Sequence, residues 1–402
     1  MKLNIPQLKI SRGFNSNVWD SRQNKFIDFS MSNGALLLGH SNKILKKSVI
    51  KSIKLGSNFS NENIYKEKYK KLILDNFKEF YDLEFSNSGS EANLRALRIC
   101  KSITKKNKFA MISGSWHGSV DTFMYDLDSK KNNNNKISLS AGNSNYSKDV
   151  YVLPHNNLKK SIEILKKVKK EISMIIIETV QASFPDKKNI DYLVGIYNFA
   201  KKNKIYIVFD EVITGMRVDK LSIFKKYNLS PDIVTLGKCF GGGLPIGITC
   251  MSSLIYKKLT KLKKKVFFGG TFSGNSLVMN AGFDTLTFLL KNKKLINEYI
   301  NTQSSKIENE INNFAKDNGI QFKLLRYESI LRPIFTSREI FSKIERAKFD
   351  KDNFESNRLR FYLQKNHILL PRNGCIFISY SHTKQQINQL IILIKKYILK
   401  HY

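Results

Sequence analysis

The stretch from Ile233 to Gly247, IVTLGKCFGGGLPIG, combines an apolar run, a lysine and a cluster of glycines. An apolar run without polar alternation predicts a strand that is buried on both faces of a sheet. Lys238 follows this strand directly, and the glycines after it leave space around its side chain. Such a lysine is partly desolvated and loses its proton more easily, as a lysine that forms a Schiff base must.

A second apolar run, IYIVFDEV from Ile205 to Val212, ends in acidic residues. Ligands of open α/β sheets bind beyond the carboxyl ends of the strands, so we expect Asp210 to face such a crevice. A lone acid there can hold a metal, act as a base or pair with a cationic ring nitrogen, and it can also simply cap the next helix. The residue types alone leave these roles open.

A third motif, SNSGSEAN from Ser86 to Asn93, precedes apolar residues at helical spacing. Small residues at a helix start present free N–H groups and the positive end of the helix dipole to an anion, typically a phosphate. Many helices begin this way without a ligand. Together with Lys238 and Asp210, however, the motif favours a cofactor with a phosphate, an aldehyde and a basic ring nitrogen, which is pyridoxal phosphate.

Strands and helices alternate along most of the chain, which predicts an α/β fold with a mostly parallel, seven-stranded sheet. The opening residues predict a hairpin with its turn at Ser21 to Asn24, and the region after Thr285 predicts α+β structure. We therefore expect a large domain at 44–284 and a smaller α+β domain built from 1–43 and 285–402. Further apolar runs that predict strands lie at 109–112, 150–153, 174–180, 248–251 and 266–268.

The composition excludes several classes of protein. The 402 residues include 68 Lys and Arg against 33 Asp and Glu, a net charge of +35. The lysines are spread along the whole chain with many Asn and Ile, which favours a coding bias over a nucleic-acid surface. No apolar run approaches the roughly 20 residues of a membrane span. We expect a cytoplasmic protein with no nucleic-acid or membrane partner, and four scattered cysteines predict neither disulfides nor a metal site.

In their order and spacing, these motifs resemble the class III, fold-type I pyridoxal-phosphate-dependent aminotransferases, in the branch similar to glutamate-1-semialdehyde 2,1-aminomutase. The resemblance covers nearly the whole chain. It implies a homodimer with active sites at the subunit interface, and a small-molecule amino donor and carbonyl acceptor. Beside the motifs above, it includes WHG (116–118), FDEVITGMRV (209–218), GGTFSGNSLVMNAG (269–282) and SHT (381–383).

The resemblance implies a role for both catalytic candidates. Lys238 matches the lysine that forms the internal aldimine and later moves a proton between the substrate Cα and the cofactor C4′. Asp210 matches the acid that keeps the pyridine nitrogen protonated, because only a cationic ring is a strong sink for carbanion electrons.

Further cofactor contacts follow from the same resemblance. An aromatic ring stacks on one face of the cofactor, an aliphatic side chain packs on the other, and small residues hold the phosphate with a threonine of the partner subunit. The matching residues are Trp116, Val212, the phosphate cup of Ser88, Gly89 and Ser90, and Thr271, with His117 and Glu178 also at the cofactor. Core packing is the alternative for Trp116 and Val212, and a scaffold role is the alternative for Glu178.

Departures from the family pattern bear on the substrate. Thr179 stands where the family has proline, Ile213 stands where many members have glutamine, and the C-terminal stretch is shorter than in aminomutases. Arg372 is a candidate for the substrate carboxylate. Arg12 and Arg22 are further candidates, although a surface position fits them better.

We therefore expect an aminotransferase with ping-pong kinetics. An intramolecular aminomutase is the alternative, and a racemase or decarboxylase on the same scaffold is a third possibility, because the reaction depends on which substrate bond stands perpendicular to the cofactor. The Asn- and Lys-rich segment Ser129 to Asn145 predicts a mobile loop with little apolar content to close over the site, which favours exchange of separate molecules. The intact Lys238 and Asp210 disfavour a basic binding protein that keeps only the fold.

Overall fold

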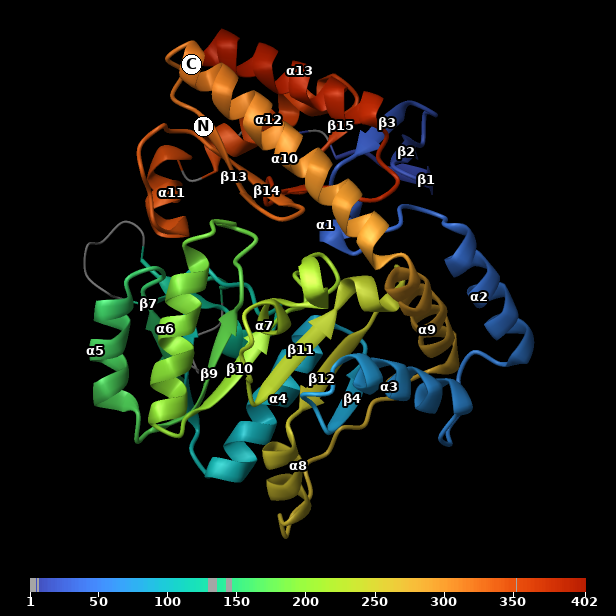
Figure 1. Ribbon diagram of the computed structural model, residues 1–402, viewed down its shortest axis with the longest axis vertical. Helices are drawn as coiled ribbons and strands as arrows, with labels where there is room; N and C mark the ends of the chain where they lie inside the picture. The colour runs from blue at the N-terminus through green and yellow to red at the C-terminus, as the bar shows by residue number, and fades with distance from the viewer. Residues whose placement is uncertain (1–4, 6, 129–135, 142–146, 352) are drawn as a thin grey trace. The chain divides into compact units, whose positions relative to one another are not determined.

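The computed structural model describes residues 5, 7–128, 136–141, 147–351 and 353–402. Most of the loop expected at Ser129 to Asn145 lies outside the described residues. The chain divides into two compact units. Figure 1 colours it by residue number, from blue at the N-terminus to red at the C-terminus. The smaller unit comprises Met1–Lys46, Ala182–Lys187 and Leu289–Tyr402, and the larger unit comprises Lys47–Gln181 and Lys188–Phe288.

A seven-stranded sheet forms the centre of the larger unit (Figure 1). Strand β12 runs antiparallel to both of its neighbours, and the other pairs of adjacent strands are parallel. The predicted mostly parallel sheet and the α/β fold class are thus confirmed. The order of strands is β4 (Asp82–Ser86), β12 (Gly247–Met251), β11 (Ile233–Gly237), β10 (Tyr206–Asp210), β9 (Ile172–Glu178), β5 (Lys108–Ile112) and β8 (Val150–Leu153).

The prediction of a strand at 266–268 is wrong. The backbone there is irregular, and the Phe267 side chain is 74% exposed instead of buried in a sheet. The seventh strand is β4, whose sequence DLEFS alternates polar and apolar residues. It pairs only with β12 in this sheet, so it is an edge strand and need not be apolar throughout.

Helices connect the strands of the larger unit. Helix α4 packs on β11 and β12, α6 packs on β10, and α5 and α6 lie side by side (Figure 1). A short pair of strands, β6 (Tyr125–Leu127) and β7 (Lys136–Ser138), forms a separate ribbon. The helices are α2 (Lys43–Leu55), α3 (Ile64–Asn76), α4 (Gly89–Thr104), α5 (Leu158–Val168), α6 (Asn189–Lys202), α7 (Ile223–Lys226), α8 (Ser253–Thr260) and α9 (Ser276–Lys291), of which α2 and α9 extend into the smaller unit.

The smaller unit brings both ends of the chain together in two sheets. One sheet has the order β1 (Ile10–Phe14), β2 (Asn17–Asp20), β3 (Lys25–Asp28) and β15 (Ile368–Leu369), and β2 and β3 form the expected hairpin. The other has the order β13 (Lys323–Tyr327), β14 (Ile330–Ile334) and β16 (Ile376–Phe377). The helices are α1 (Met31–Gly34), α10 (Lys293–Asp317), α11 (Lys343–Phe349), α12 (Phe354–Lys365) and α13 (Lys384–His401).

Within the described ranges, no helix is both long and apolar enough to cross a membrane. The four cysteines, at positions 100, 239, 250 and 375, are buried and form no disulfide. The described residues also include no cluster of three or more His, Cys, Asp or Glu side chains arranged to hold a metal ion.

Candidate active site

Three adjacent strands place Glu178, Asp210 and Lys238 at one edge of the large sheet. Strand β9 ends at Glu178, which lies opposite Asp210, the last residue of β10. Asp210 lies opposite Thr235 of β11, and Lys238 begins the 3-10 helix that follows β11. Because these strands are parallel, their carboxyl ends meet at the same edge. The structure therefore brings together the residues that the sequence singled out on separate strands.

Lys238 occupies a strained and partly desolvated position. Its backbone φ of +48° lies in the left-handed region, which is costly for a residue with a Cβ. Burial lowers the pKa of the Lys238 ammonium and Arg217 lowers it further, whereas the nearby Glu178 and Asp210 oppose this shift. A lowered pKa increases the fraction of neutral amine, which is the nucleophilic form.

Asp210 is buried and held by three donors. Its Oδ2 accepts a hydrogen bond from Asn93 Nδ2 at 2.7 Å and lies 2.8 Å from His117 Nδ1, and its Oδ1 accepts the N–H of Val212 at 3.0 Å. A fixed carboxylate of this kind is suited to pair with a cationic nitrogen in a low-dielectric site.

Asn93 is a site residue that sequence reasoning did not assign. Its Nδ2 also donates to the carbonyl of His117 at 3.0 Å, and its Oδ1 accepts from Thr235 Oγ1 at 2.6 Å. Asn93 thus links α4, β11 and the loop that carries His117. The sequence did contain one indication that Asn93 belongs to the site. It lies in SNSGSEAN one helical turn after Gly89, so both residues are on the same face of α4.

His117 is buried beside Asp210 and retains one unpaired ring nitrogen. With Nδ1 directed to Asp210, Nε2 has no hydrogen-bond partner among the described residues. The ring of Phe123 lies edge-on to it, with centroids 5.7 Å apart. His117 therefore fixes Asp210 from the side, and its expected contact with the cofactor stays a prediction.

The predicted phosphate cup lies at the start of α4. Ser88 caps the helix by accepting the Glu91 N–H at 3.2 Å, and the first N–H groups of any helix have no intrahelical partner. Gly89 is required by packing, because a Cβ there would lie 2.8 Å from Val212 Cγ1. Ser90 Oγ accepts the N–H of Ser119 at 3.3 Å. The cup thus contacts both the segment after β10 and the loop after Trp116.

Trp116 and Val212 differ in burial. The Trp116 ring is 55% exposed, which excludes core packing as its role. Its backbone N–H donates to Glu178 Oε2 at 2.8 Å, so the carboxyl at the end of β9 anchors the loop that carries the ring. Val212 is partly buried against Gly89.

Thr271 lies on an exposed segment of the larger unit. Its carbonyl accepts from Asn58 Nδ2 at 3.2 Å, and within the part of the chain that the structure describes its hydroxyl forms no hydrogen bond with the phosphate cup. Arg95 and Arg98 of α4 fasten the segment, since Arg95 Nη2 donates to Ser273 Oγ at 3.1 Å and Arg98 Nη1 donates to the carbonyl of Phe267 at 2.8 Å.

The three arginines considered for the substrate carboxylate all belong to the smaller unit. Arg12 is exposed and lies over the Trp19 ring, with its guanidinium carbon 4.2 Å from the ring centroid. Arg22 is also exposed, as expected for surface residues. Arg372 lines a pocket of this unit.

The residues at this edge of the sheet fit pyridoxal phosphate. Gly89 keeps a cradle open that a Cβ would fill, the start of α4 offers N–H groups for a phosphate, and the Trp116 ring is left uncovered. Asp210 is a fixed carboxylate of the kind that suits a basic ring nitrogen, and Lys238 provides an amine of lowered pKa. Fold and site together define a pyridoxal-phosphate-dependent enzyme of fold type I.

Comparison with known proteins identifies the family. Residues 2–328 match the model of the aminotransferase class-III family, and the chain belongs to that family. Among its curated relatives, the glutamate-1-semialdehyde 2,1-aminomutase of Archaeoglobus fulgidus is 29% identical over 391 residues, covering 95% of this chain and 90% of the relative. The enzyme of the same name from Caldicellulosiruptor bescii is 30% identical over 401 residues, covering 98% and 92%.

Solved structures show the same fold. An omega-transaminase from Sphaerobacter thermophilus superposes with a TM-score of 0.90 at 18% identity, covering 99% of this chain and 92% of that one. A β-phenylalanine aminotransferase from Variovorax paradoxus superposes with a TM-score of 0.87 at 25% identity, covering 100% and 89%. The expected fold, family and pyridoxal phosphate cofactor are therefore confirmed, and amino transfer is the chemistry of this family.

Proposed function

We propose that this protein is an aminotransferase that takes an amino group from one small molecule and delivers it to the carbonyl carbon of another, with Lys238 and Asp210 as its catalytic residues. The observation that carries the proposal is the convergence of the Lys238 amine and the buried Asp210 carboxylate at the ends of adjacent strands. When bound, pyridoxal phosphate supplies an electron sink that stabilises negative charge at the substrate Cα.

Lys238 has two tasks. Its neutral amine, favoured by burial, would hold the cofactor through the aldehyde carbon, and the same amine would take up the proton from the substrate Cα. Asp210 would pair with the ring nitrogen of the cofactor and, through its negative charge, favour a proton there. Asn93 and His117 keep that carboxylate in place, so little reorganisation is required during the reaction.

The other residues position the cofactor. The start of α4 would hold the phosphate, and Val212 and Trp116 would contact the ring, while Glu178 anchors the Trp116 loop. We propose that Thr271 completes the phosphate cup of the partner subunit in a homodimer. The exposed side chains of Phe267 and Phe272 on the same segment support an interface there.

The homodimer can be tested through its cofactor. A ligand that binds across an interface stabilises it, so removal of the cofactor is expected to weaken the dimer in light scattering. A monomer with full cofactor occupancy would contradict the shared site. The cytoplasmic location expected from the sequence stays a prediction.

The bond to Lys238 is tested by borohydride reduction of the purified holoenzyme. The reduced cofactor should remain attached to the peptide that contains Lys238, as identified by mass spectrometry. Lys238→Ala should lose this label, whereas Lys257→Ala, at an exposed position of α8, should keep it. Label on a different lysine would overturn the assignment.

Intramolecular amino transfer is the second candidate, because the two curated relatives described above are named glutamate-1-semialdehyde 2,1-aminomutase. The test supplies the amino form of the enzyme with glutamate-1-semialdehyde and no amino donor. Efficient conversion to 5-aminolevulinate would establish the mutase and overturn the proposal. Formation of 2-oxoglutarate from glutamate in a separate half-reaction supports the aminotransferase. Racemisation or decarboxylation of the donor without amino transfer would overturn both candidates.

A further inference from the structure

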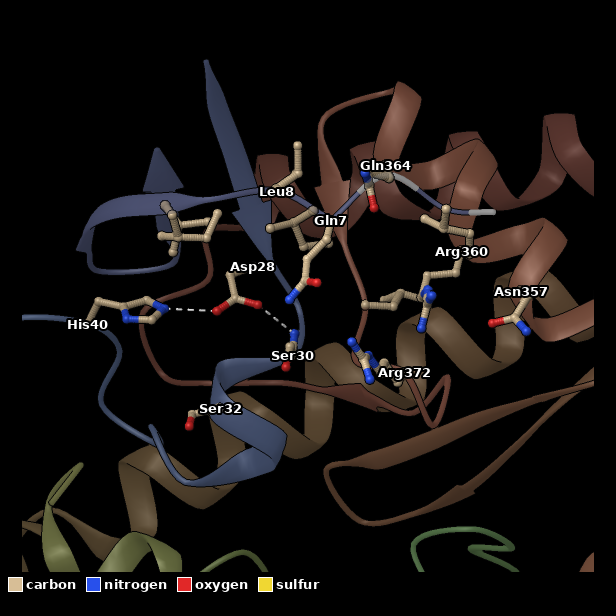
Figure 2. Close-up of a pocket in the computed structure, with 15 residues that line it drawn as sticks. Gln7, Leu8, Asp28, Ser30, Ser32, His40, Asn357, Arg360, Gln364 and Arg372 are labelled. Atoms are coloured by element: carbon tan, nitrogen blue, oxygen red, sulfur yellow. Dashed lines mark hydrogen bonds and ion pairs between the residues drawn. The ribbon is translucent and has the colours of Figure 1, made fainter. Parts of the chain in front are cut away.

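The connection between β9 and α6 passes from the larger unit into the smaller unit and back. Strand β9 ends at Glu178 in the larger unit, residues 182–187 belong to the smaller unit, and α6 begins at Asn189 in the larger unit again. We call residues 178–187 the strap. None of residues 182–187, all of which the structure describes, lines the pocket shown in Figure 2, so the strap is separate from the pocket of Arg372.

The first part of the strap holds the loop that carries Trp116. Glu178 Oε2 accepts the Trp116 N–H at 2.8 Å, and Gln181 Nε2 donates to the carbonyl of Ser113 at 2.8 Å and to Ser115 Oγ at 3.0 Å. The Gln181 side chain is buried, so a polar group left without its partner here has no water to replace it. The loop before Trp116 is therefore fixed by two side chains of the strap.

The second part of the strap is anchored in the core of the smaller unit. The Phe184 side chain is fully buried, and Cys375 Sγ donates to the carbonyl of Ala182 at 3.1 Å. Displacing a fully buried ring leaves a cavity and is therefore costly. The position of the strap thus depends on the packing around Phe184, which involves Ile334, Ile340, Leu325 and Phe349.

We propose that Gln181 and Phe184 are positioning residues for the Trp116 loop, so that the strap links the order of this loop to the packing of the smaller unit. Only Ala182 and Ser183 lie between them, which leaves little backbone to absorb a displacement of either side chain. If the Phe184 ring loses its place, the Gln181 carboxamide shifts away from the loop. The inference rests on the proposed function in one respect, because the loop serves the reaction only if Trp116 contacts the cofactor.

The fluorescence anisotropy of Trp116 reports the order of this loop. The chain has two tryptophans, so Trp19→Phe leaves Trp116 as the single tryptophan. All further variants are made in this background and are measured as purified holoenzymes. Anisotropy falls when a side chain gains motion on the nanosecond timescale. The rate of cofactor release, followed by absorbance, is the second readout.

Phe184→Ala and Gln181→Met should both lower the anisotropy of Trp116 and release the cofactor about twofold to tenfold faster, the range expected for the loss of one hydrogen bond. Ile394→Ala is the matched control, because it removes another fully buried apolar side chain of the smaller unit, on α13 and outside the cluster of Phe184. It should lower stability but keep the anisotropy and the release rate of the background. If Phe184→Ala does not fold, Phe184→Leu takes its place.

The proposal is overturned if the folded Phe184 variant keeps the anisotropy of the background, if Gln181→Met keeps it, or if Ile394→Ala lowers it equally. Lower anisotropy with unchanged cofactor release would support the strap and argue against contact between Trp116 and the cofactor. Because neither readout involves turnover, failure of the proposed amino transfer would leave this result unaffected.

Discussion

Glu211→Gln is expected to flatten the pH dependence of unfolding between about pH 5 and pH 8. Glu211 follows Asp210 and is fully buried. Its carboxylate accepts hydrogen bonds from the N–H groups of Ile223 at 2.9 Å and Phe224 at 3.0 Å and from Thr214 Oγ1 at 3.0 Å. Burial nevertheless raises the pKa of Glu211 from 4.5 to about 7.

The sign and size of the effect follow from this shift. Between the two pKa values the folded chain binds a proton at Glu211 that the unfolded chain has released. The stabilisation is therefore fully present below about pH 4.5 and is lost as the pH rises through about 7. At about 1.4 kcal/mol per pKa unit, the shift corresponds to about 3 kcal/mol, most of which falls within the chosen window.

Urea unfolding, followed by circular dichroism at intervals across the window, measures the change. Relative to Glu211→Gln, the wild type should lose about 2 to 3 kcal/mol as the pH rises, because the amide cannot ionise. Glu67→Gln removes a charge from an exposed position of α3, so its profile should run parallel to that of the wild type. If the Glu211→Gln profile also runs parallel to the wild type, Glu211 does not titrate in this range and the reasoning is refuted.

Three further changes test the site. Asp210→Asn should keep the fold but lower turnover by a few orders of magnitude, because an amide does not stabilise a cationic ring. Near-normal turnover on a verified amino donor would place Asp210 outside the site. Asn93→Ala removes the 2.7 Å bond to Asp210 and should lower kcat by about tenfold to a hundredfold with little change in KM; steady-state kinetics with unchanged kcat would argue against this positioning role. Gly247→Ala places a Cβ 2.0 Å from the carbonyl oxygen of Ser88, so cofactor affinity in an absorbance titration should fall at least about tenfold, and wild-type affinity would contradict this coupling.

The sequence predicts central strands better than edge strands. Strands β9, β10 and β11 have neighbours on both sides and are buried throughout, so each appears as a continuous apolar run. Strand β4 has one neighbour in its sheet and retains Asp82 and Glu84, which removes that signal. Conversely, the apolar residues at 266–268 attach to α4 through a backbone carbonyl and leave Phe267 exposed. An apolar run of three residues therefore does not show whether the segment forms a buried strand or an exposed, irregular stretch of backbone.

The candidate site shows a similar limit. Lys238 and Asp210 could be singled out because the end of a buried strand is a recognisable position for a polar residue. The role of Asn93 could not, because its contact with Asp210 joins residues 117 positions apart.

The pairing of β3 with β15 has a consequence for biosynthesis. Ile27 lies opposite Ile368, so the sheet that begins with the first strands of the chain is completed by residues near its end. A ribosome must therefore synthesise everything from Asp28 to Ile368 before this sheet can close, whereas every strand of the seven-stranded sheet is available by Met251. The side chains of Val18 and Phe26 are apolar and buried in the folded protein. During elongation they stay exposed until the later residues that complete this sheet have been synthesised. Strands β1 to β3 are thus open to chaperones and proteases until β15 has been synthesised.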